Sequence, residues 1–274
     1  MSGKLILVGT PIGNLGDMSW RAVETLKNAD RIACEDTRQT IKLLNHFEIK
    51  NRLEAYHKYN EQKESEKLIS LMKEGETIAL VSDAGLPVIS DPGNIIVRKC
   101  REAGVPVEVI PGPNAGLTAL MLSGLDAGSF LFIGFLGKAS KDFKAGIRRI
   151  AESRETVILY ESPHRLLKLL QALEAAVPER EISISREITK KFEETISGTA
   201  SELLAHFEEK SPKGEFVVIV SGDTSEPANE LNELTEAEHV AHYERSGMSE
   251  KDAMKAAAKD RGVSKREIYN ALKR

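Results

Sequence analysis

Short apolar runs alternate with longer amphipathic segments through the first 110 residues of the chain. The runs are rich in Ile, Leu, Val and Ala and end at Gly, Pro or polar residues, which is typical of buried parallel strands. The longer segments carry apolar residues three and four positions apart, as amphipathic helices do. This alternation predicts an α/β fold with a largely parallel sheet. The predicted strands are Lys4–Val8, Arg31–Cys34, Leu53–Ala55, Thr77–Val81 and Val105–Ile110. Five helices are predicted. The first begins at about Ser19, the second ends at Phe47, the third and fourth span Glu61–Lys73 and Asn94–Ala103, and the fifth begins at about Leu117.

The same alternation restarts after the segment Ser123–Ser129, whose Gly- and Ser-containing composition suits a connection between domains. We therefore expect one α/β domain over residues 1–122 and a second over residues 123–222. The strands predicted in the second domain are Phe130–Gly134, Thr156–Tyr160, Glu181–Arg186, Glu194–Ser197 and Glu215–Val220. Its predicted helices are Phe143–Ala151, Arg165–Ala176 and Ser201–Glu208.

The end of the chain has a different character. Gly222–Asn232 is polar and is predicted to be a linker. Helices are predicted at Glu236–Arg245, Glu250–Asp260 and Lys265–Lys273. A tight connection through Gly262 and a basic last helix resemble a helix-turn-helix, although a helical cap that only packs fits equally well. Residues 223–274 are thus expected to form a linker and a small basic helical domain.

Composition and charge narrow the function classes. Of the 274 residues 41% are hydrophobic and 29% charged, as in an ordinary globular protein. No run of eighteen apolar residues is present, so we expect no membrane-spanning segment. The two cysteines, Cys34 and Cys100, have no metal-ligand spacing, which favours reduced thiols in a cytoplasmic protein. The N-terminal residues lack the apolar core of a signal peptide.

The net charge of −4 is unevenly distributed. Residues 223–246 carry a net charge of −6, residues 247–274 carry +4, and the first 222 residues carry −2. An acidic segment followed by a basic tail favours an end of the chain that faces nucleic acid. Solvated helix faces explain the same charges, so this pattern alone leaves both interpretations open.

Four strand-to-helix connections are rich in Gly, Pro or polar residues. They are Gly9–Asn14, Glu35–Arg38, Ser82–Gly93 and Pro111–Ala115. Because the carboxyl ends of parallel strands meet at one edge of a sheet, we expect these loops to line one crevice. Their small residues allow the backbone to approach a ligand closely. The pattern therefore predicts a small-molecule site, with Asp91 expected to cap the helix that begins near Asn94.

Familiar cofactor fingerprints do not match. Gly9, Gly13 and Gly16 lack the dinucleotide-binding spacing, and the segment 134–139 lacks the P-loop pattern, which disfavours ligands with a pyrophosphate. Among the histidines only His239 and His242 have helix-like spacing, and we expect them on a solvated helix face. No metal site is predicted.

Several longer motifs together resemble a known family. They are GTPIGNL at 9–15, EDTR at 35–38, SDAG at 82–85 with SDPG at 90–93, IPGP at 110–113, YESPHR at 160–165, and RE at 186–187 with KK at 190–191. The chain is similar to the small-subunit ribosomal RNA methyltransferases of the tetrapyrrole-methylase-like class (class III) of S-adenosylmethionine-dependent enzymes. The resemblance covers residues 4–222 in order and extends into the helical tail. Asn114 departs from it, since a smaller residue is expected there.

The resemblance implies a fold with two α/β domains and the methyl donor, S-adenosylmethionine, in the cleft between them. Asp83 would accept hydrogen bonds from the amino group or ribose of the donor. The implied donor-binding residues are Pro11, Ile12, Asp83, Gly85, Leu86, Asn114, Ala115, Tyr160 and Gly214. A homodimer is also implied.

The implied reaction is methyl transfer to the 2′-hydroxyl of a decoding-centre cytidine in the 16S ribosomal RNA of the small (30S) ribosomal subunit. Such a reaction needs no metal, but the hydroxyl proton must be removed and the alkoxide stabilised. A carboxylate could take the proton, and an Arg or a Lys of lowered pKa could stabilise the alkoxide. The candidate catalytic residues are Glu161, Arg186, Glu187 and Lys190.

RNA binding requires positive surface, which two stretches supply. The candidate RNA contacts are Lys138, Lys141, Arg148 and Arg149 in the second domain and Lys255, Lys259, Lys265 and Arg266 in the terminal helices. Two other functions remain open at this point. One is methylation of a small tetrapyrrole-like substrate, which the same fold supports. The other is a non-catalytic adaptor that binds RNA, although such a protein would not need four ligand-lining loops.

Overall fold

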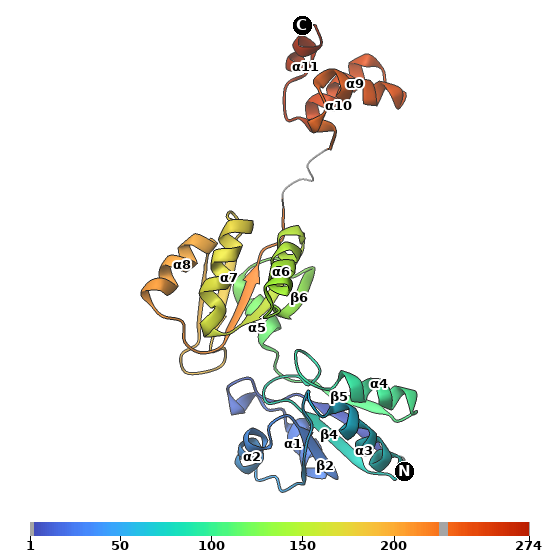
Figure 1. Ribbon diagram of the computed structural model, residues 1–274, viewed down its shortest axis with the longest axis vertical. Coiled ribbons are helices and arrows are strands. Elements are labelled where there is room, and N and C mark those ends of the chain that lie inside the picture. The colour runs from blue at the N-terminus through green and yellow to red at the C-terminus, as the bar shows by residue number, and fades with distance from the viewer. Residues whose placement is uncertain (1–2, 225–229, 274) are drawn as a thin grey trace. The chain divides into compact units, whose positions relative to one another are not determined.

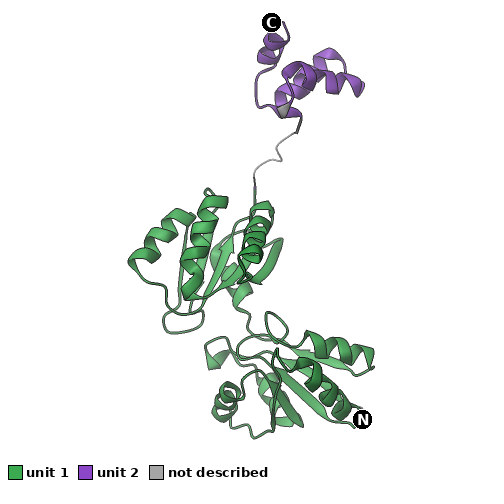
Figure 2. Ribbon diagram, in the orientation of Figure 1, with its two compact units in different colours: residues 1–223 green, residues 224–274 purple. Residues whose placement is uncertain are grey.

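The computed structural model describes residues 3–224 and 230–273 (Figure 1). The chain forms two compact units, residues 1–223 and residues 224–274 (Figure 2). The predicted linker Gly222–Asn232 includes residues 225–229, which lie outside the described residues. None of the described helices has the length and apolar character needed to cross a bilayer.

The first unit begins with a five-stranded sheet in the order β3-β2-β4-β1-β5, in which all strand pairs are parallel, as predicted. Its strands are β1 (Lys4–Val8), β2 (Arg31–Cys34), β3 (Leu53–Ala55), β4 (Thr77–Val81) and β5 (Val107–Ile110). Its helices are η1 (Leu15–Asp17), α1 (Trp20–Asn28), α2 (Thr37–His46), α3 (Glu61–Lys73) and α4 (Asn94–Glu102).

Helices cover both faces of this sheet because successive strand residues point to opposite sides. Ile6 and Val8 pack with apolar residues of α1 and α2. Leu5, the residue before Ile6, points to the other face and packs with residues of α3 and α4. A parallel sheet buried on both faces requires apolar side chains at nearly every position, which explains why its strands read as unbroken apolar runs.

A second five-stranded sheet in the same unit has the order β6-β7-β10-β8-β9. Only β6 and β7 are parallel, and β10 runs antiparallel to β7 and β8. Its strands are β6 (Phe130–Phe135), β7 (Thr156–Glu161), β8 (Ile182–Arg186), β9 (Glu194–Gly198) and β10 (Phe216–Val220). Its other helices are α6 (Ser140–Glu152), α7 (Pro163–Ala176) and α8 (Ala200–Glu209). Phe216 lies opposite Glu161 and Arg186, so the segment before β10 reaches the same edge as the ends of β7 and β8.

Helix α5 (Ala115–Ser123) packs on the second sheet, where it contacts β7, β8, β9 and β10. Its residues Ala119 and Leu120 share a buried apolar cluster with Ile158. The structure thus differs from the predicted domain boundary at residue 122, which placed this helix with the first sheet. The Gly- and Ser-containing segment that suggested the boundary begins with the end of a helix, because Gly124 is the left-handed C-cap of α5 (φ 72°).

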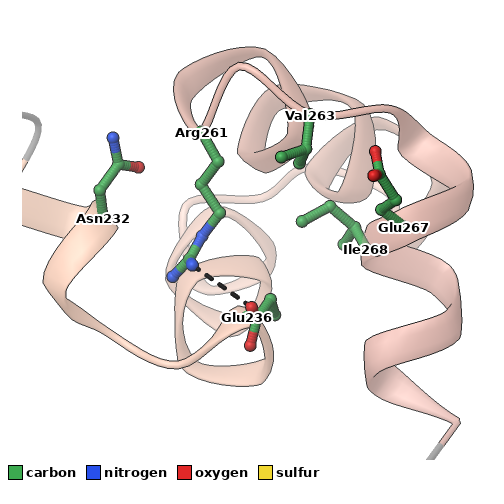
Figure 3. Close-up of a pocket in the computed structure, with 6 residues that line it drawn as sticks. All are labelled: Asn232, Glu236, Arg261, Val263, Glu267 and Ile268. Carbon is green, nitrogen blue, oxygen red and sulfur yellow. Dashed lines mark ion pairs between the residues drawn. The ribbon is translucent and has the colours of Figure 1, made fainter.

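The second unit consists of η2 (Glu230–Glu233), α9 (Glu236–Arg245), α10 (Glu250–Asp260) and α11 (Lys265–Leu272). His239 is fully buried, which contradicts the predicted solvated position, whereas His242 is exposed. The His239 ring contacts Asp260 Oδ2 through Nε2 at 3.2 Å, and its Nδ1 accepts a hydrogen bond from Arg261 Nε. Arg261 also pairs with Glu236 at 3.5 Å (Figure 3). Polar side chains from two helices and a turn therefore pack at the centre of this unit.

The loops after β1 and β5 approach so closely that neither tolerates a side chain at the contact. A Cβ at Gly9 would lie 2.7 Å from Gly112 Cα and 2.8 Å from Gly112 N. We predict that Gly9→Ala lowers the free energy of unfolding by about 1–3 kcal/mol, since backbone atoms must move. Urea unfolding of both variants measures this, with Gly128→Ala as control, because its Cβ would meet only the Asp126 side chain at 3.3 Å. Equal stability of the two variants would contradict the close approach.

Candidate functional site

The four polar loops of the first sheet meet in one cavity of about 450 Å³, as predicted. Each loop contributes to its wall, for example with Ile12, Glu35, Asp83 and Asn114. The opposite wall comes from the second sheet and the segments at its edge: Phe135, Tyr160, Glu161, Ser162, Pro163, Gly214, Glu215, Phe216 and Val217. The cavity therefore lies between the two sheets of the first unit.

A second cavity of about 460 Å³ adjoins the first. Four residues line both: Ile12, Asp83, Ala84 and Glu215. Its other lining residues are Thr10, Pro11, Gly13, Leu15, Gln39, Lys42, Leu43 and Lys190. Two compartments with a shared wall suit a reaction in which a group passes from one bound molecule to another.

The predicted donor-binding residues gather at these cavities. Those that line the first cavity are Ile12, Asp83, Gly85, Leu86, Asn114, Ala115, Tyr160 and Gly214, and Pro11 lines the second. The predicted catalytic residues are more dispersed. Glu161 lines the first cavity and Lys190 the second, whereas Arg186 and Glu187 line neither.

Backbone contacts hold the loops after β1, β2 and β4 together. Thr10 N–H donates to Gly85 O at 2.8 Å, and Gly85 N–H donates back to Thr10 O at 3.2 Å. Asp83 Oδ1 accepts a hydrogen bond from the backbone N–H of Asp36 at 3.1 Å. Asp36 in turn caps α2 and pairs with Arg38, whose hydrogen bonds lower the pKa of Asp36 to about 2. The position of Asp83 at both cavities is thus fixed from two neighbouring loops.

The loop that ends in Gly93 is strained. Val88 and Ser90 have φ angles of 78° and 66°, a region that β-branched residues in particular avoid. Gly93 is the N-cap of α4, without a side-chain cap, and its N–H donates to Glu61 Oε1 at 2.9 Å. The prediction that Asp91 caps this helix is therefore wrong. Asp91 lines the first cavity instead.

Asp91 and Glu35 line the first cavity, although neither was predicted from the sequence to be a ligand-binding residue. Burial, together with the nearby carboxylates of Glu35 and Asp83, raises the pKa of Asp91 to about 6. Burial and the charge of Asp83 also raise the pKa of Glu35. Both residues stand in loops that the sequence assigned to the crevice, but only the folded arrangement brings their carboxylates together. The cavity is consequently acidic and suits a cationic ligand.

Glu161 has an incompletely satisfied carboxylate. The residue is 3% exposed and its Oε1 accepts a hydrogen bond from Ser162 N–H at 2.8 Å, with Arg165 Nε 3.8 Å away. Among the described residues its buried Oε2 has no hydrogen-bond partner. A buried carboxylate oxygen without a partner is costly, so a bound ligand that donates a hydrogen bond or carries a positive charge would offset that cost.

Tyr160 and Asn114 organise the wall near α5. The Tyr160 hydroxyl accepts a hydrogen bond from Gly116 N–H at 3.2 Å, and burial raises its pKa. Asn114 caps α5, since its Oδ1 accepts a hydrogen bond from Leu117 N–H at 2.9 Å. This cap explains why a polar side chain can replace the smaller residue expected there, because Asn is among the preferred N-cap residues.

The segment after β8 carries the remaining catalytic candidates. Arg186 pairs with Glu194 on β9 at 2.9 Å. Lys190 Nζ donates to Glu187 Oε1 at 3.0 Å and to Glu215 Oε2 at 2.7 Å. Burial lowers the pKa of Lys190, but these carboxylates outweigh burial and raise it overall. The expectation of a lysine with lowered pKa is therefore wrong for Lys190, which carries its charge at neutral pH.

The candidate RNA contacts form two groups of four residues, one in each unit. Lys138 precedes α6, and Lys141, Arg148 and Arg149 are exposed on that helix. In the second unit Lys255 and Lys259 are exposed on α10, one helical turn apart. Lys265 is partly buried and Arg266 exposed, both in the first turn of α11.

The acidic cavity generates a pH prediction. We expect the Asp91 carboxyl to titrate at about pH 6, measured by carbon NMR of labelled aspartates, and Glu35→Gln to lower this pKa because it removes a nearby negative charge. Since the folded pKa lies above the usual value of 3.8, protonation of Asp91 stabilises the fold below that value, and this contribution is lost as the pH rises through 6. Glu108→Gln, at an exposed position on β5, is the control; an unchanged Asp91 pKa in Glu35→Gln would refute the coupling.

Comparisons with known proteins agree on one family. The family described as Tetrapyrrole (Corrin/Porphyrin) Methylases matches residues 4–204. The chain is 47% identical to "Ribosomal RNA small subunit methyltransferase I" of Bacillus subtilis, over 98% of this chain and 94% of the relative. A relative of the same name from Escherichia coli O157:H7 is 43% identical, over 97% of this chain and 93% of the relative. One from Thermotoga maritima is also 43% identical, but 99% of it aligns with only 80% of this chain.

Solved structures with low sequence identity share the fold. Diphthine synthase superposes with a TM-score of 0.63 at 16% identity, over 82% of this chain and 92% of that chain. Uroporphyrin-III-C-methyltransferase from Thermus thermophilus gives a TM-score of 0.56 at 22% identity, over 79% of this chain and 94% of that chain.

Proposed function

Because the chain belongs to the tetrapyrrole methylase family of S-adenosylmethionine-dependent methyltransferases, we propose that it methylates the 2′-hydroxyl of a decoding-centre cytidine in 16S ribosomal RNA. The observation that carries the choice of substrate is the near full-length similarity, at 47% and 43% identity, to relatives named for small-subunit ribosomal RNA. The proposed acceptor is the RNA within the small (30S) ribosomal subunit. The proposed site of action is the cytoplasm.

The first cavity fits the methyl donor. S-adenosylmethionine supplies an electrophilic methyl group on a sulfonium and also carries an ammonium. The carboxylates of Asp83, Asp91 and Glu161 line this cavity, and Glu161 Oε2 lacks a partner among the described residues. These groups would hold the cationic donor, which would also remove the cost of placing several carboxylates close together. Gly85 and Gly214, both with positive φ, let the backbone reach the ligand.

Of the four catalytic candidates, Lys190 has the best position for acting on the acceptor. It lines the second cavity, shares that wall with Glu215, and is held there by two carboxylates. We propose that the Glu215 carboxylate, which lines both cavities, takes the proton of the 2′-hydroxyl as its oxygen attacks the donor methyl group, and that the Lys190 ammonium stabilises the developing alkoxide. Glu161 remains a candidate for the donor side of the reaction. Arg186 and Glu187 would act by positioning this segment, because their charges are paired with Glu194 and Lys190.

The RNA would extend from the site over basic surface. We propose contacts to Lys138, Lys141, Arg148 and Arg149 in the first unit and to Lys255, Lys259, Lys265 and Arg266 in the second. A homodimer is also proposed, and an exposed apolar face of α5 supports it. Leu117, Met121 and Leu122 on that helix are 46%, 82% and 45% exposed, and an exposed apolar patch can mark a protein–protein contact.

Labelled donor tests the function directly. The protein is incubated with S-adenosylmethionine labelled in the methyl group and with small ribosomal subunits from cells that lack the enzyme. Digestion of the RNA to nucleosides should then recover the label in 2′-O-methylcytidine. Label in a base or in another nucleoside would contradict the proposed acceptor. Transfer only to an added tetrapyrrole would instead support the small-molecule alternative.

Lys190 gives a sharper prediction. We expect Lys190→Ala to reduce kcat by about 10²–10³-fold, as loss of an oxyanion-stabilising group does, with the Kd of the donor nearly unchanged. Lys190→Arg should restore part of the loss, because the positive charge returns. The control is Lys191→Ala, which removes an adjacent exposed ammonium that faces the Phe192 ring. A kcat for Lys190→Ala equal to that of the control would refute the role.

The terminal unit generates a separate prediction. All residues that line the two cavities belong to the first unit, so the donor cavity should not need the terminal helices. We expect deletion of residues 225–274 to weaken binding to small ribosomal subunits by about tenfold, because it removes basic residues that contact phosphates, and to leave donor affinity unchanged. Subunit binding is measured by sedimentation and donor binding by calorimetry. Unchanged subunit affinity would show that this unit does not bind RNA.

A further inference from the structure

The second cavity contains a lysine that none of the roles above uses. Gln39, Lys42 and Leu43 lie three and four positions apart on α2, so they share the helix face that lines this cavity. Lys42 Nζ donates a hydrogen bond to Gln39 Oε1 at 2.9 Å. Within the part of the chain that the structure describes, no carboxylate forms an ion pair with Lys42. Lys42 is exposed, and its ammonium lies at the wall of this cavity beside a neutral partner.

Apart from Asp83 and Glu215, which line both cavities, the charged residues of the two cavities differ in sign. Glu35, Asp91 and Glu161 line only the first cavity, whereas Lys42 and Lys190 line only the second. Lys190 is already paired with two carboxylates, so of these two lysines Lys42 is the one without a carboxylate partner among the described residues. Ammonium groups of this kind bind phosphate oxygens through charge-assisted hydrogen bonds.

Resting on the proposed function, we propose that the second cavity admits the acceptor nucleotide and that Lys42 binds a backbone phosphate next to the reacting ribose. The 2′-hydroxyl would then meet the donor at the shared wall formed by Ile12, Asp83, Ala84 and Glu215. Transfer requires the reacting atoms about 3–3.5 Å apart, so the two bound molecules would have to meet at this common wall. Gln39 is a positioning residue, because its oxygen holds the Lys42 ammonium on the cavity side of α2.

Two substitutions test the Lys42 charge in different ways. Lys42→Ala deletes the ammonium, while Gln39→Glu keeps it but supplies a carboxylate of the same shape that neutralises it. We expect both to raise the KM for small ribosomal subunits about tenfold, with kcat and the Kd of the donor within twofold of the unsubstituted enzyme. Loss of one phosphate contact should also lower by about one the magnitude of the slope of log affinity against log salt concentration. Lys42→Arg should retain the KM for subunits and the salt slope of the unsubstituted enzyme.

Lys73→Ala is the matched control, since Lys73 is an exposed lysine at the end of α3 and lines neither cavity. Lys42→Ala with the KM and salt slope of this control would refute the phosphate contact while the unsubstituted enzyme still methylates RNA. An unsubstituted enzyme that binds the donor but labels no RNA would refute the proposed function itself. The two failures therefore give different results.

Discussion

Two peptide groups that face each other beyond the ends of parallel strands hold the site together. Thr10 and Gly85 exchange backbone hydrogen bonds, so the loops after β1 and β4 continue as a short antiparallel bridge. Gly85 can take the required φ of 79° without strain because it has no Cβ. Asp83 ties the loop after β2 to the same bridge through Asp36 N–H. Since backbone groups form the bridge between Thr10 and Gly85, neighbouring side chains remain to face the cavity.

The parallel sheet from which these loops emerge explains why so much of the fold could be predicted from the sequence. A parallel sheet covered on both faces must be apolar throughout, and its loops must satisfy their polar backbone in other ways. The strands Lys4–Val8, Arg31–Cys34 and Thr77–Val81 were predicted to the residue for this reason. The four loops were predicted to share a site because parallel strands end at one edge.

The parts that the sequence did not predict depend on contacts between distant segments. The pKa of Asp91 is raised by burial and by Glu35, 56 positions away in the chain and on another loop. His239 is polar and lies in an acidic segment, yet Asp260 and Arg261 satisfy its ring inside a helical core. Helix α5 has no amphipathic pattern that would assign it to one sheet. In each case the local sequence is compatible with several environments, and packing selects one.

Electrostatics links the fold to the proposed chemistry. Carboxylates close together in a partly buried cavity raise one another's pKa, as they do at Asp91, and a cationic donor reverses that penalty. A polyanionic acceptor would be repelled by the same carboxylates, so it needs a compartment of its own with positive charge. Lys190 lines the second cavity with its charge already balanced by Glu187 and Glu215, and Glu215 lines both cavities. The division into two cavities with one shared wall thus resolves a conflict that a single cavity would impose on a cationic donor and an anionic RNA.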